Sequence, residues 1–285
     1  MKKNKRHIIQ ILFTALTNGY LTGFIEGKIY KGDLKKYCVP GLNCYSCPGA
    51  LGSCPIGSIQ AVLAEGNFKF AFYVAAFLIF FGSLLGRFVC GFLCPFGLVQ
   101  DLLYKIPFFK KTKNMPGHKV LVWFKYVIFI LFVILLPMFA VDMFGMGKPW
   151  FCKYICPSGT LMGGIPLLIM DEQLRAFTGV LFYVKIAILI IIVILSIIVY
   201  RPFCKYICPL GAIYSVFNPI AFYRYRVDKD KCTGCGACKK ACKMDIKVYE
   251  KPNSLECIRC GECIKACPEE AIELEKLFYK NKTKK

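Results

Sequence analysis

The sequence predicts a mainly α-helical membrane protein, a four-span helical bundle with short corner helices that is followed by a small C-terminal α+β domain. Two observations predict this fold. Of the 285 residues, 56% are hydrophobic and 15% are aromatic, which is more apolar than an ordinary soluble domain. The 18 cysteines are concentrated in short regular runs, and the densest of these runs lies near the C-terminus.

Four apolar segments are the expected spans. Residues 70–86, 121–141 and 180–200 are each close to the ~20 apolar residues that cross ~30 Å of hydrocarbon. Residues 8–24 carry several polar side chains, so we expect this span to pack against protein rather than lipid. The leading MKKNKRH resembles the start of a signal peptide, but no small-residue cleavage site follows, so the segment is expected to be retained.

The formal net charge of +21 comes largely from basic residues that flank the apolar segments. This pattern favours a membrane protein over a nucleic-acid partner. By the positive-inside rule both termini are expected in the cytoplasm of a prokaryote, with the chain multi-pass in the cytoplasmic membrane and the basic tail 275–285 at its inner leaflet. The lysine-rich loop between the first two spans fits this rule less well.

A short phrase, Cys-Pro-x-Gly, occurs four times in the membrane region 1–224. The copies, named the first to fourth corners, are Cys54–Gly57, Cys94–Gly97, Cys156–Gly159 and Cys208–Gly211. The last three have an added cysteine four residues upstream, namely Cys90, Cys152 and Cys204. The second and fourth corners are also preceded by arginine, at Arg87 and Arg201. The first corner has Ala50 in the upstream position, and its neighbouring cysteines are Cys38, Cys44 and Cys47.

Proline directly after a cysteine suits the first turn of a helix, so each corner cysteine is expected at a helix N-terminus. Free N–H groups and the helix dipole at that position favour a thiolate or a bound anionic group. The alternative is a recurring turn with buried, inert thiols. Four copies favour the functional interpretation.

Two runs of spacing Cys-x2-Cys-x2-Cys-x3-Cys occupy the C-terminal region. This spacing is typical of a pair of [4Fe-4S] clusters, in which the fourth cysteine of each run ligates the other run's cluster. The expected ligands are Cys232, Cys235, Cys238 and Cys267 for one cluster, and Cys257, Cys260, Cys263 and Cys242 for the other. Zinc knuckles and disulfides are the alternatives, and two intact runs argue against them.

A compact two-cluster ferredoxin-like domain is therefore expected over residues 225–274, with small strands near 247–250 and 271–274. Gly236 and Gly261 are expected where the backbone needs positive φ beside cluster sulfurs.

The alternation of spans and corners predicts how the remaining cysteines pair. The second and fourth corners are expected at the cytoplasmic face, where Cys90, Cys94, Cys204 and Cys208 would form a four-thiolate site. The first and third are expected outside, where Cys44, Cys47, Cys54, Cys152 and Cys156, with Cys38, give six thiols although a cubane needs four. The membrane region thus has room for one or two further clusters, one at each face.

The segments Arg87–Gly97 and Arg201–Pro209, with the terminal double run, resemble the NapH/NosR family of membrane ferredoxin-type proteins. The resemblance covers most of the chain. It implies at least four spans, cytoplasmic clusters, and electron transfer between the quinone pool or a cytosolic donor and an enzyme that faces outward. The sequence departs from the family in its extra cysteine corners, and it lacks the large flavin-binding domain of NosR.

Few other residues have the chemistry of a redox site. His7 and His118 are the two histidines and both lie near the expected cytoplasmic boundary, so no haem held by paired histidines is expected. A quinone headgroup would be contacted by His118 or Asp101, although interfacial polar groups are the commoner role for such residues. Lys125 and Lys185 lie near span ends, where a lysine snorkels or balances the charge of a nearby cluster.

The expected function is electron transfer by a membrane-anchored iron–sulfur protein, a subunit of an oxidoreductase system rather than a stand-alone enzyme. Its expected partners are membrane lipid, a redox protein and a quinone, without nucleic acid. A thiol–disulfide conduit that uses the outer cysteines is one alternative. A redox-sensing or maturation factor for a partner metalloenzyme is the other.

Overall fold

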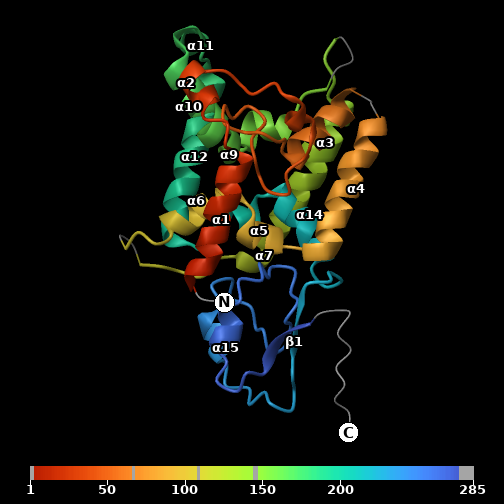
Figure 1. The fold of residues 1–285 in the computed structure, drawn as a ribbon, viewed down its shortest axis with the longest axis vertical. Helices are drawn as coiled ribbons and strands as arrows, with labels where there is room; N and C mark the ends of the chain where they lie inside the picture. Colours follow the sequence, from red (N-terminus) through yellow and green to blue (C-terminus); the bar gives the residue numbers. More distant parts are fainter. Residues whose placement is uncertain (1–2, 66–67, 108–109, 144–146, 276–285) are drawn as a thin grey trace.

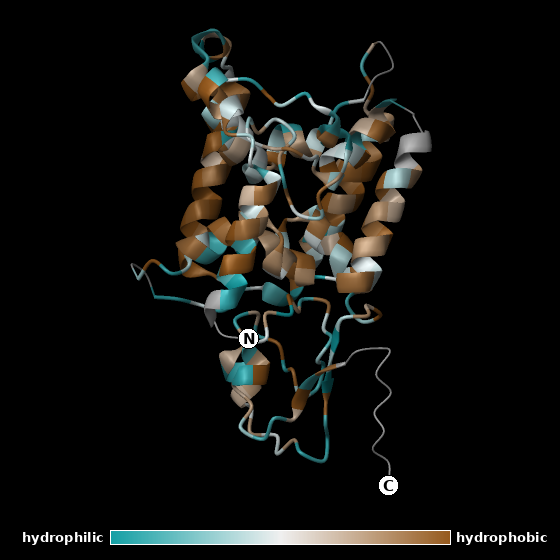
Figure 2. Cartoon of the chain, viewed as in Figure 1, coloured by the Kyte–Doolittle hydropathy of each residue, from teal (hydrophilic) through white to brown (hydrophobic). Residues whose placement is uncertain are grey.

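The computed structural model describes residues 3–65, 68–107, 110–143 and 147–275. It is mostly helical, with a bundle at one end and a small cysteine-rich C-terminal unit at the other (Figure 1). Figure 2 shows that the bundle helices are hydrophobic along most of their length, whereas the C-terminal unit is mixed. Apart from Glu275, the basic tail lies outside the described residues.

Helical stretches occupy all four expected spans in whole or in part. They are α1 (Lys3–Thr17), α4 (Phe68–Leu85), the continuous stretch α7–η2–α8 (His118–Ile128, Phe129–Leu135, Leu136–Phe139) and α12 (Val180–Ile198). The last two, of 22 and 19 residues, are long and apolar enough to cross a membrane. Within the most apolar 18 residues of each stretch, 22% and 17% respectively are buried. Most of the apolar surface of the two stretches therefore faces outward.

The first expected span, 8–24, is not one helix. α1 ends at Thr17, and the chain turns before the short helix α2 (Thr22–Glu26). The Leu51 N–H donates to the Thr17 carbonyl, so a neighbouring loop satisfies a group that a continuing helix would have used. The 15 residues of α1 extend about 22 Å, which is shorter than ~30 Å of hydrocarbon.

Each corner starts a helix at its proline, which confirms the sequence prediction. These helices are α3 (Pro55–Glu65), α6 (Pro95–Leu103), the stretch α9–η4–α10 (Pro157–Gly159, Thr160–Gly164, Ile165–Met170) and α14 (Pro209–Phe217). The turns before the last three corners are α5 (Phe88–Phe92), η3 (Phe151–Ile155) and α13 (Pro202–Tyr206). The remaining helical turns are η1 (Asp33–Lys36) and α11 (Glu172–Ala176). The segments η2, η3 and η4 are π-helical.

The C-terminal unit contains β1 (Arg224–Val227), α15 (Ala237–Ala241), α16 (Glu262–Lys265) and β2 (Ile272–Glu275). The two strands pair antiparallel, which confirms a strand near 271–274. The prediction of a strand at 247–250 was wrong. The N–H groups of Glu250 and Lys251 both donate to the Lys247 carbonyl and close a turn there.

A buried charge cluster joins the bundle to the C-terminal unit. Glu256 pairs with Arg87 at 2.5 Å and also with Lys125, and the side chains of both cations are fully buried. Burial alone would raise the pKa of Glu256, but the charges of Arg87 and Lys125 lower this pKa below its ordinary value. The Asn218 amide adds hydrogen bonds to the carbonyls of Ser254 at 2.9 Å and Cys257 at 2.7 Å. These contacts fix the segment before Cys257 against the bundle.

Replacement of Glu256 by Gln should destabilise the protein by about 3–5 kcal/mol, because two buried cations lose their counter-charge. The control is Asp33→Asn, which breaks an exposed pair with Lys36 and should cost no more than about 1 kcal/mol. Denaturant unfolding in detergent, followed by circular dichroism, measures both variants. Equal stability of the two would contradict the role of Glu256.

Candidate metal centres

The corner cysteines lie at helix N-termini, and each thiol accepts a backbone hydrogen bond from the glycine three residues later. The Cys156 and Cys208 Sγ atoms accept from the N–H of Gly159 and Gly211, each at 3.4 Å. Cys54 and Cys94 accept in the same way from the glycines of their own corners. The Cys-Pro-x-Gly phrase therefore builds a sulfur site with a donor already directed at the sulfur.

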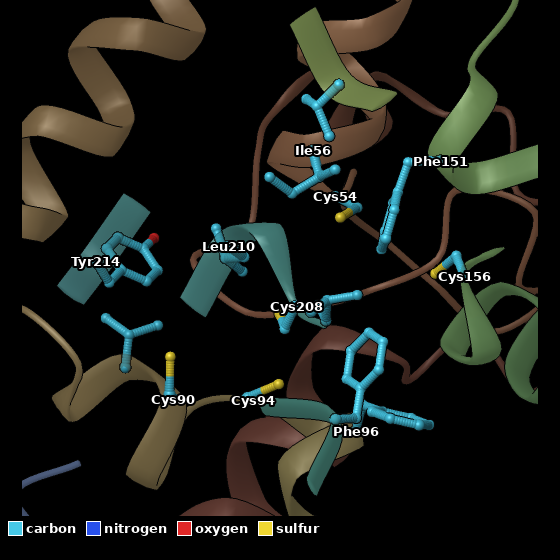
Figure 3. Close-up of a cluster of buried hydrophobic side chains, with 14 of the residues drawn as sticks. Cys54, Ile56, Cys90, Cys94, Phe96, Phe151, Cys156, Cys208, Leu210 and Tyr214 are labelled. Carbon is cyan, nitrogen blue, oxygen red and sulfur yellow. The ribbon is translucent and has the colours of Figure 1, made fainter. Parts of the chain in front are cut away.

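The second and fourth corners meet inside the bundle. Cys90, Cys94, Cys204 and Cys208, named the corner 2/4 group, are all buried. The Cys208 thiol is close enough to interact electrostatically with the other three thiols. The Cys94 thiol interacts in the same way with those of Cys90 and Cys204. Figure 3 shows Cys90, Cys94 and Cys208 around the start of α14. The structure thus brings together the four thiols that the sequence paired.

The first and third corners also meet, and the geometry selects four of the six candidate thiols. Cys152 lies within electrostatic reach of Cys44, Cys54 and Cys156, and Cys156 lies within reach of Cys44 and Cys54. A Cβ atom on Gly159 would be 3.7 Å from the Cys44 Sγ and 3.9 Å from the Cys156 Sγ. Cys44, Cys54, Cys152 and Cys156 are named the corner 1/3 group.

Two cysteines contact this group less: Cys47 interacts electrostatically with Cys44 alone among its members. The Cys38 Sγ contacts the Ser58 hydroxyl at 3.6 Å. Cys47 follows Cys44 in a turn closed by the Cys47 N–H to the Cys44 carbonyl at 3.1 Å. Cys44 therefore occupies the fourth position that Ala50 leaves without a thiol.

Two arginines hold the corner 2/4 group together, because each donates a hydrogen bond to the opposite corner. Arg87, before the second corner, donates to the carbonyl of Cys204 at 3.0 Å. Arg201, before the fourth corner, donates to the carbonyl of Cys90 at 2.5 Å. Both side chains are fully buried. Each arginine thus fixes the upstream cysteine of the opposite corner and places positive charge beside the thiols.

A second buried charge network supports Arg201. Asp101 on α6 accepts from the Arg201 Nε at 2.8 Å and also pairs with Arg6 of α1. Burial alone would raise the pKa of Asp101, but Arg201 and Arg6 lower this pKa well below its ordinary range. Both of its oxygens serve this network, so Asp101 has a structural role and is not a free contact for a quinone headgroup.

Two glutamines that the sequence analysis did not identify donate to cysteine sulfurs. The Gln100 Nε2 lies 3.1 Å from the Cys204 Sγ, and the Gln60 Nε2 lies 3.2 Å from the Cys152 Sγ. Each glutamine is six residues after a corner cysteine, in the extended phrase Cys-Pro-x-Gly-x-x-Gln of the first two corners. Comparing the repeats over one more helical turn would have found both.

The eight cysteines of the C-terminal unit lie around two positions. A pocket is lined by Cys232, Cys235, Cys238 and Cys267. At the second expected cluster position, the Cys263 thiol is close enough to interact electrostatically with the thiols of Cys257, Cys260 and Cys242. Burial raises the pKa of the Cys257 thiol to about 12.

The two glycines expected near these thiols have the expected backbone conformation. Gly236 and Gly261, directly before α15 and α16, have φ values of 73° and 78°. This left-handed conformation is open to glycine without steric cost.

The other candidate residues have identifiable partners. Lys185 donates to the Cys152 carbonyl at 3.4 Å, and Lys125 pairs with Glu256. His118 Nδ1 lies 3.0 Å from the Tyr206 hydroxyl, and His7 Nδ1 lies 3.2 Å from the Gln10 side chain. Both lysines therefore face protein groups beside the cysteine sets.

The four cysteine sets fit [4Fe-4S] clusters. Among the described residues, no three His, Cys, Asp or Glu side chains converge closely enough to bind one metal ion. A cubane spreads its four thiolates over four iron atoms, so its ligands need not converge on one point. The buried Arg87 Nε, beside the corner 2/4 group, has no hydrogen-bond partner among the described residues, and an anionic cluster would supply negative charge there.

Comparisons with known proteins agree with this chemistry. A family model described as a 4Fe-4S binding domain matches residues 70–116, 124–168 and 181–222, and each match contains a helical stretch and the corner that follows it. A model described as a 4Fe-4S dicluster domain matches residues 224–268. The chain is therefore an iron–sulfur protein with several 4Fe-4S binding domains.

The chain is 30% identical over 204 residues to uncharacterized protein MJ0750 of Methanocaldococcus jannaschii, an alignment that covers 70% of this chain and 76% of that one. It belongs to the same family as MJ0750. Uncharacterized protein MJ0749 of the same organism is 30% identical over 180 residues, or 61% of this chain and 58% of that one.

A more distant relative is the "Putative electron transport protein YccM" of Escherichia coli strain K12. It is 24% identical over 172 residues, or 58% of this chain and 43% of that one. No solved structure matches the chain.

In iron-free folded protein, a maleimide should modify Cys235 at least roughly tenfold faster than Cys208, because the reagent must reach the thiol. Cys235 is exposed, whereas the Cys208 side chain is buried. Peptide mass spectrometry measures both rates, and denatured protein is the control in which both thiols react alike. Equal rates in the folded protein would contradict the buried corner 2/4 group.

Proposed function

We propose that this chain is a membrane-anchored iron–sulfur protein that carries electrons between a cytosolic or quinone-pool donor and a partner redox enzyme, as in the NapH/NosR-like family that it resembles. One observation carries the proposal: apart from Cys38 and Cys47, the 18 cysteines fall into four sets of four. Bound [4Fe-4S] clusters supply one-electron transfer. The chain supplies thiolates, hydrogen bonds to sulfur and burial.

The proposed ligands are two sets in the C-terminal unit and two in the bundle. In the C-terminal unit they are Cys232, Cys235, Cys238 and Cys267, and Cys257, Cys260, Cys263 and Cys242. In the bundle they are the corner 2/4 group and the corner 1/3 group. The matches to two kinds of 4Fe-4S domain, one in each region, support this division of the chain near residue 224.

Membrane anchoring is supported by the outward-facing apolar surface. Ile190, Ile191 and Ile194 on α12 are exposed, as are Ile130 and Phe139 on the α7–η2–α8 stretch. Exposed apolar surface of this extent is typical of a membrane or protein interface. In the proposed arrangement α4 and α1 complete a four-span bundle, and both termini lie on the cytoplasmic side of a prokaryotic membrane.

The buried residues around the thiols would set the reduction potentials. Gln100 and Gln60 donate to cysteine sulfurs, and hydrogen bonds to sulfur favour the more negative reduced state. Arg87 and Arg201 add positive charge inside the bundle. These glutamine and arginine side chains favour the electron-transfer hypothesis over the thiol–disulfide hypothesis. Thiol–disulfide exchange needs a pair of accessible thiols that are free to react.

The choice of ligands in the corner 1/3 group has a direct test. Cys152→Ala should lower the iron content by about four atoms per chain, because one cubane loses a ligand. Cys47→Ala is the matched control, and its iron content should equal that of the unmodified protein. A loss of iron in Cys47→Ala, with full iron in Cys152→Ala, would reverse the assignment.

Gln100→Leu should make one reduction potential more negative by about 20–60 mV, the equivalent of one hydrogen bond of about 0.5–1.5 kcal/mol for one electron. Potentiometric titration followed by electron paramagnetic resonance measures the shift. Gln173→Leu, on the exposed helix α11, is the control and should leave all potentials unchanged. Unchanged potentials in Gln100→Leu, at full iron content, would remove the corner 2/4 group from the electron path.

A further inference from the structure

The loop after Cys38 enters the core of the bundle and lies against the second and fourth corners. The Tyr214 hydroxyl of α14 donates to the Pro40 carbonyl at 3.0 Å. At Gly41 the backbones approach so closely that an added Cβ would be 2.7 Å from the Leu93 carbonyl oxygen and 3.0 Å from the Cys94 Cα. Figure 1 shows the red-orange loop between α2 and α3 descending into the bundle.

Two consecutive amides of this loop bind cysteines of different groups. The Leu42 N–H donates to the Cys94 thiol of the corner 2/4 group. The Asn43 N–H donates to the Cys54 thiol of the corner 1/3 group. Two consecutive backbone amides, one on each side of the Leu42 Cα, therefore bridge the two groups.

This bridge sets an upper bound on the separation of the groups. Consecutive backbone nitrogens are no more than about 4 Å apart, and an N–H to sulfur hydrogen bond spans up to about 4 Å. The Cys94 and Cys54 sulfurs are then within about 12 Å of each other, less than half of ~30 Å of hydrocarbon. Cys54, Cys94, Cys156 and Cys208 also belong to one continuous buried core, part of which Figure 3 shows.

This arrangement differs from the sequence expectation of one site at each face of the membrane. That expectation assumed that each corner ends a span that crosses the full bilayer. In the structure the loop of the first corner folds back into the bundle and carries Cys44 and Cys54 towards the second and fourth corners.

We propose that the segment Pro40–Asn43 joins the corner 2/4 group and the corner 1/3 group into one electron-transfer unit, in which two clusters lie side by side near the centre of the bundle. This inference rests on the proposed function, because it needs a cluster in each group. Transfer between the groups moves one electron, with no bond formed or broken and no proton moved.

The positioning residues of the unit are Leu42 and Asn43. Their side chains are 3% and 0% exposed. The Asn43 amide donates to the carbonyl of Thr17 at 3.4 Å and to that of Gly52 at 3.5 Å. The bridging segment is therefore held by α1 on one side and by the loop just before the first corner on the other.

Magnetic interaction between the clusters tests the inference. Dipolar coupling falls with the cube of the distance, so it is about fifteenfold stronger at about 12 Å than at ~30 Å. In dithionite-reduced protein, the signal of the corner 2/4 group should be split or broadened by its neighbour. Cys152→Ala removes that neighbour and should sharpen the signal. Cys235→Ala, in the C-terminal unit, should leave the splitting of the core signal in place.

A second variant acts on the bridge itself. Gly41→Ala forces the segment away from Cys94 and should weaken the coupling at unchanged iron content. Gly164→Ala is the control, because its Cβ would meet atoms no nearer than 3.7 Å and the coupling should persist.

The possible results separate the inference from the function on which it rests. Full iron content with uncoupled core signals, or a coupling that Cys152→Ala does not change, would overturn the bridged unit and leave the proposed function standing. Iron for two clusters alone would remove the core clusters and, with them, the proposed function of the bundle cysteines.

Discussion

The rest of the structure depends on one constraint: the cysteines of the corner 2/4 group and the corner 1/3 group lie inside an apolar bundle, where the proposed function requires them to be anionic ligands. A buried charge without compensation is costly. The chain meets this requirement with helix N-termini that direct N–H groups at sulfur, and with Arg87 and Arg201, each of which holds the opposite corner. Asp101 and Glu256 then balance these arginines and attach α1 and the C-terminal unit to the same centre. Ligand geometry, charge balance and the contact between the two regions are thus parts of one network.

The internal repeat explains how one chain assembles several similar sites. The 4Fe-4S binding model matches three successive segments, and each segment supplies a helical stretch and a corner. Gln60 and Gln100 occupy the same position in two corners and donate to Cys152 and Cys204, which occupy the same position in two others. The first corner lacks the upstream cysteine, and the loop before it places Cys44 with the group instead. The same loop supplies the two amides that bridge the two groups.

Much of this arrangement could be predicted from the sequence, because cysteine spacing is a strong local signal. The helix that starts at each corner proline and the pairing of the second with the fourth corner both follow from short motifs. The position of Cys44, and the closeness of the two groups, could not be predicted in this way. Both depend on a loop that folds back into the bundle, and loop paths leave no periodic pattern in a sequence.

Two other differences have similar causes. The break of the first apolar segment after Thr17 depends on hydrogen bonds with Gly49 and Leu51, which are distant in sequence. The short apolar run 247–250 looked like a strand, but a local turn satisfies its backbone instead. Gln60 and Gln100 were visible in principle, because they extend the repeat by one helical turn.

The most direct test of the central claim is the amount of iron and acid-labile sulfide in the full chain, purified without oxygen. Four occupied cysteine sets predict about sixteen atoms of each per chain. About eight of each would mean that the C-terminal unit alone holds clusters, and it would contradict an electron path through the bundle.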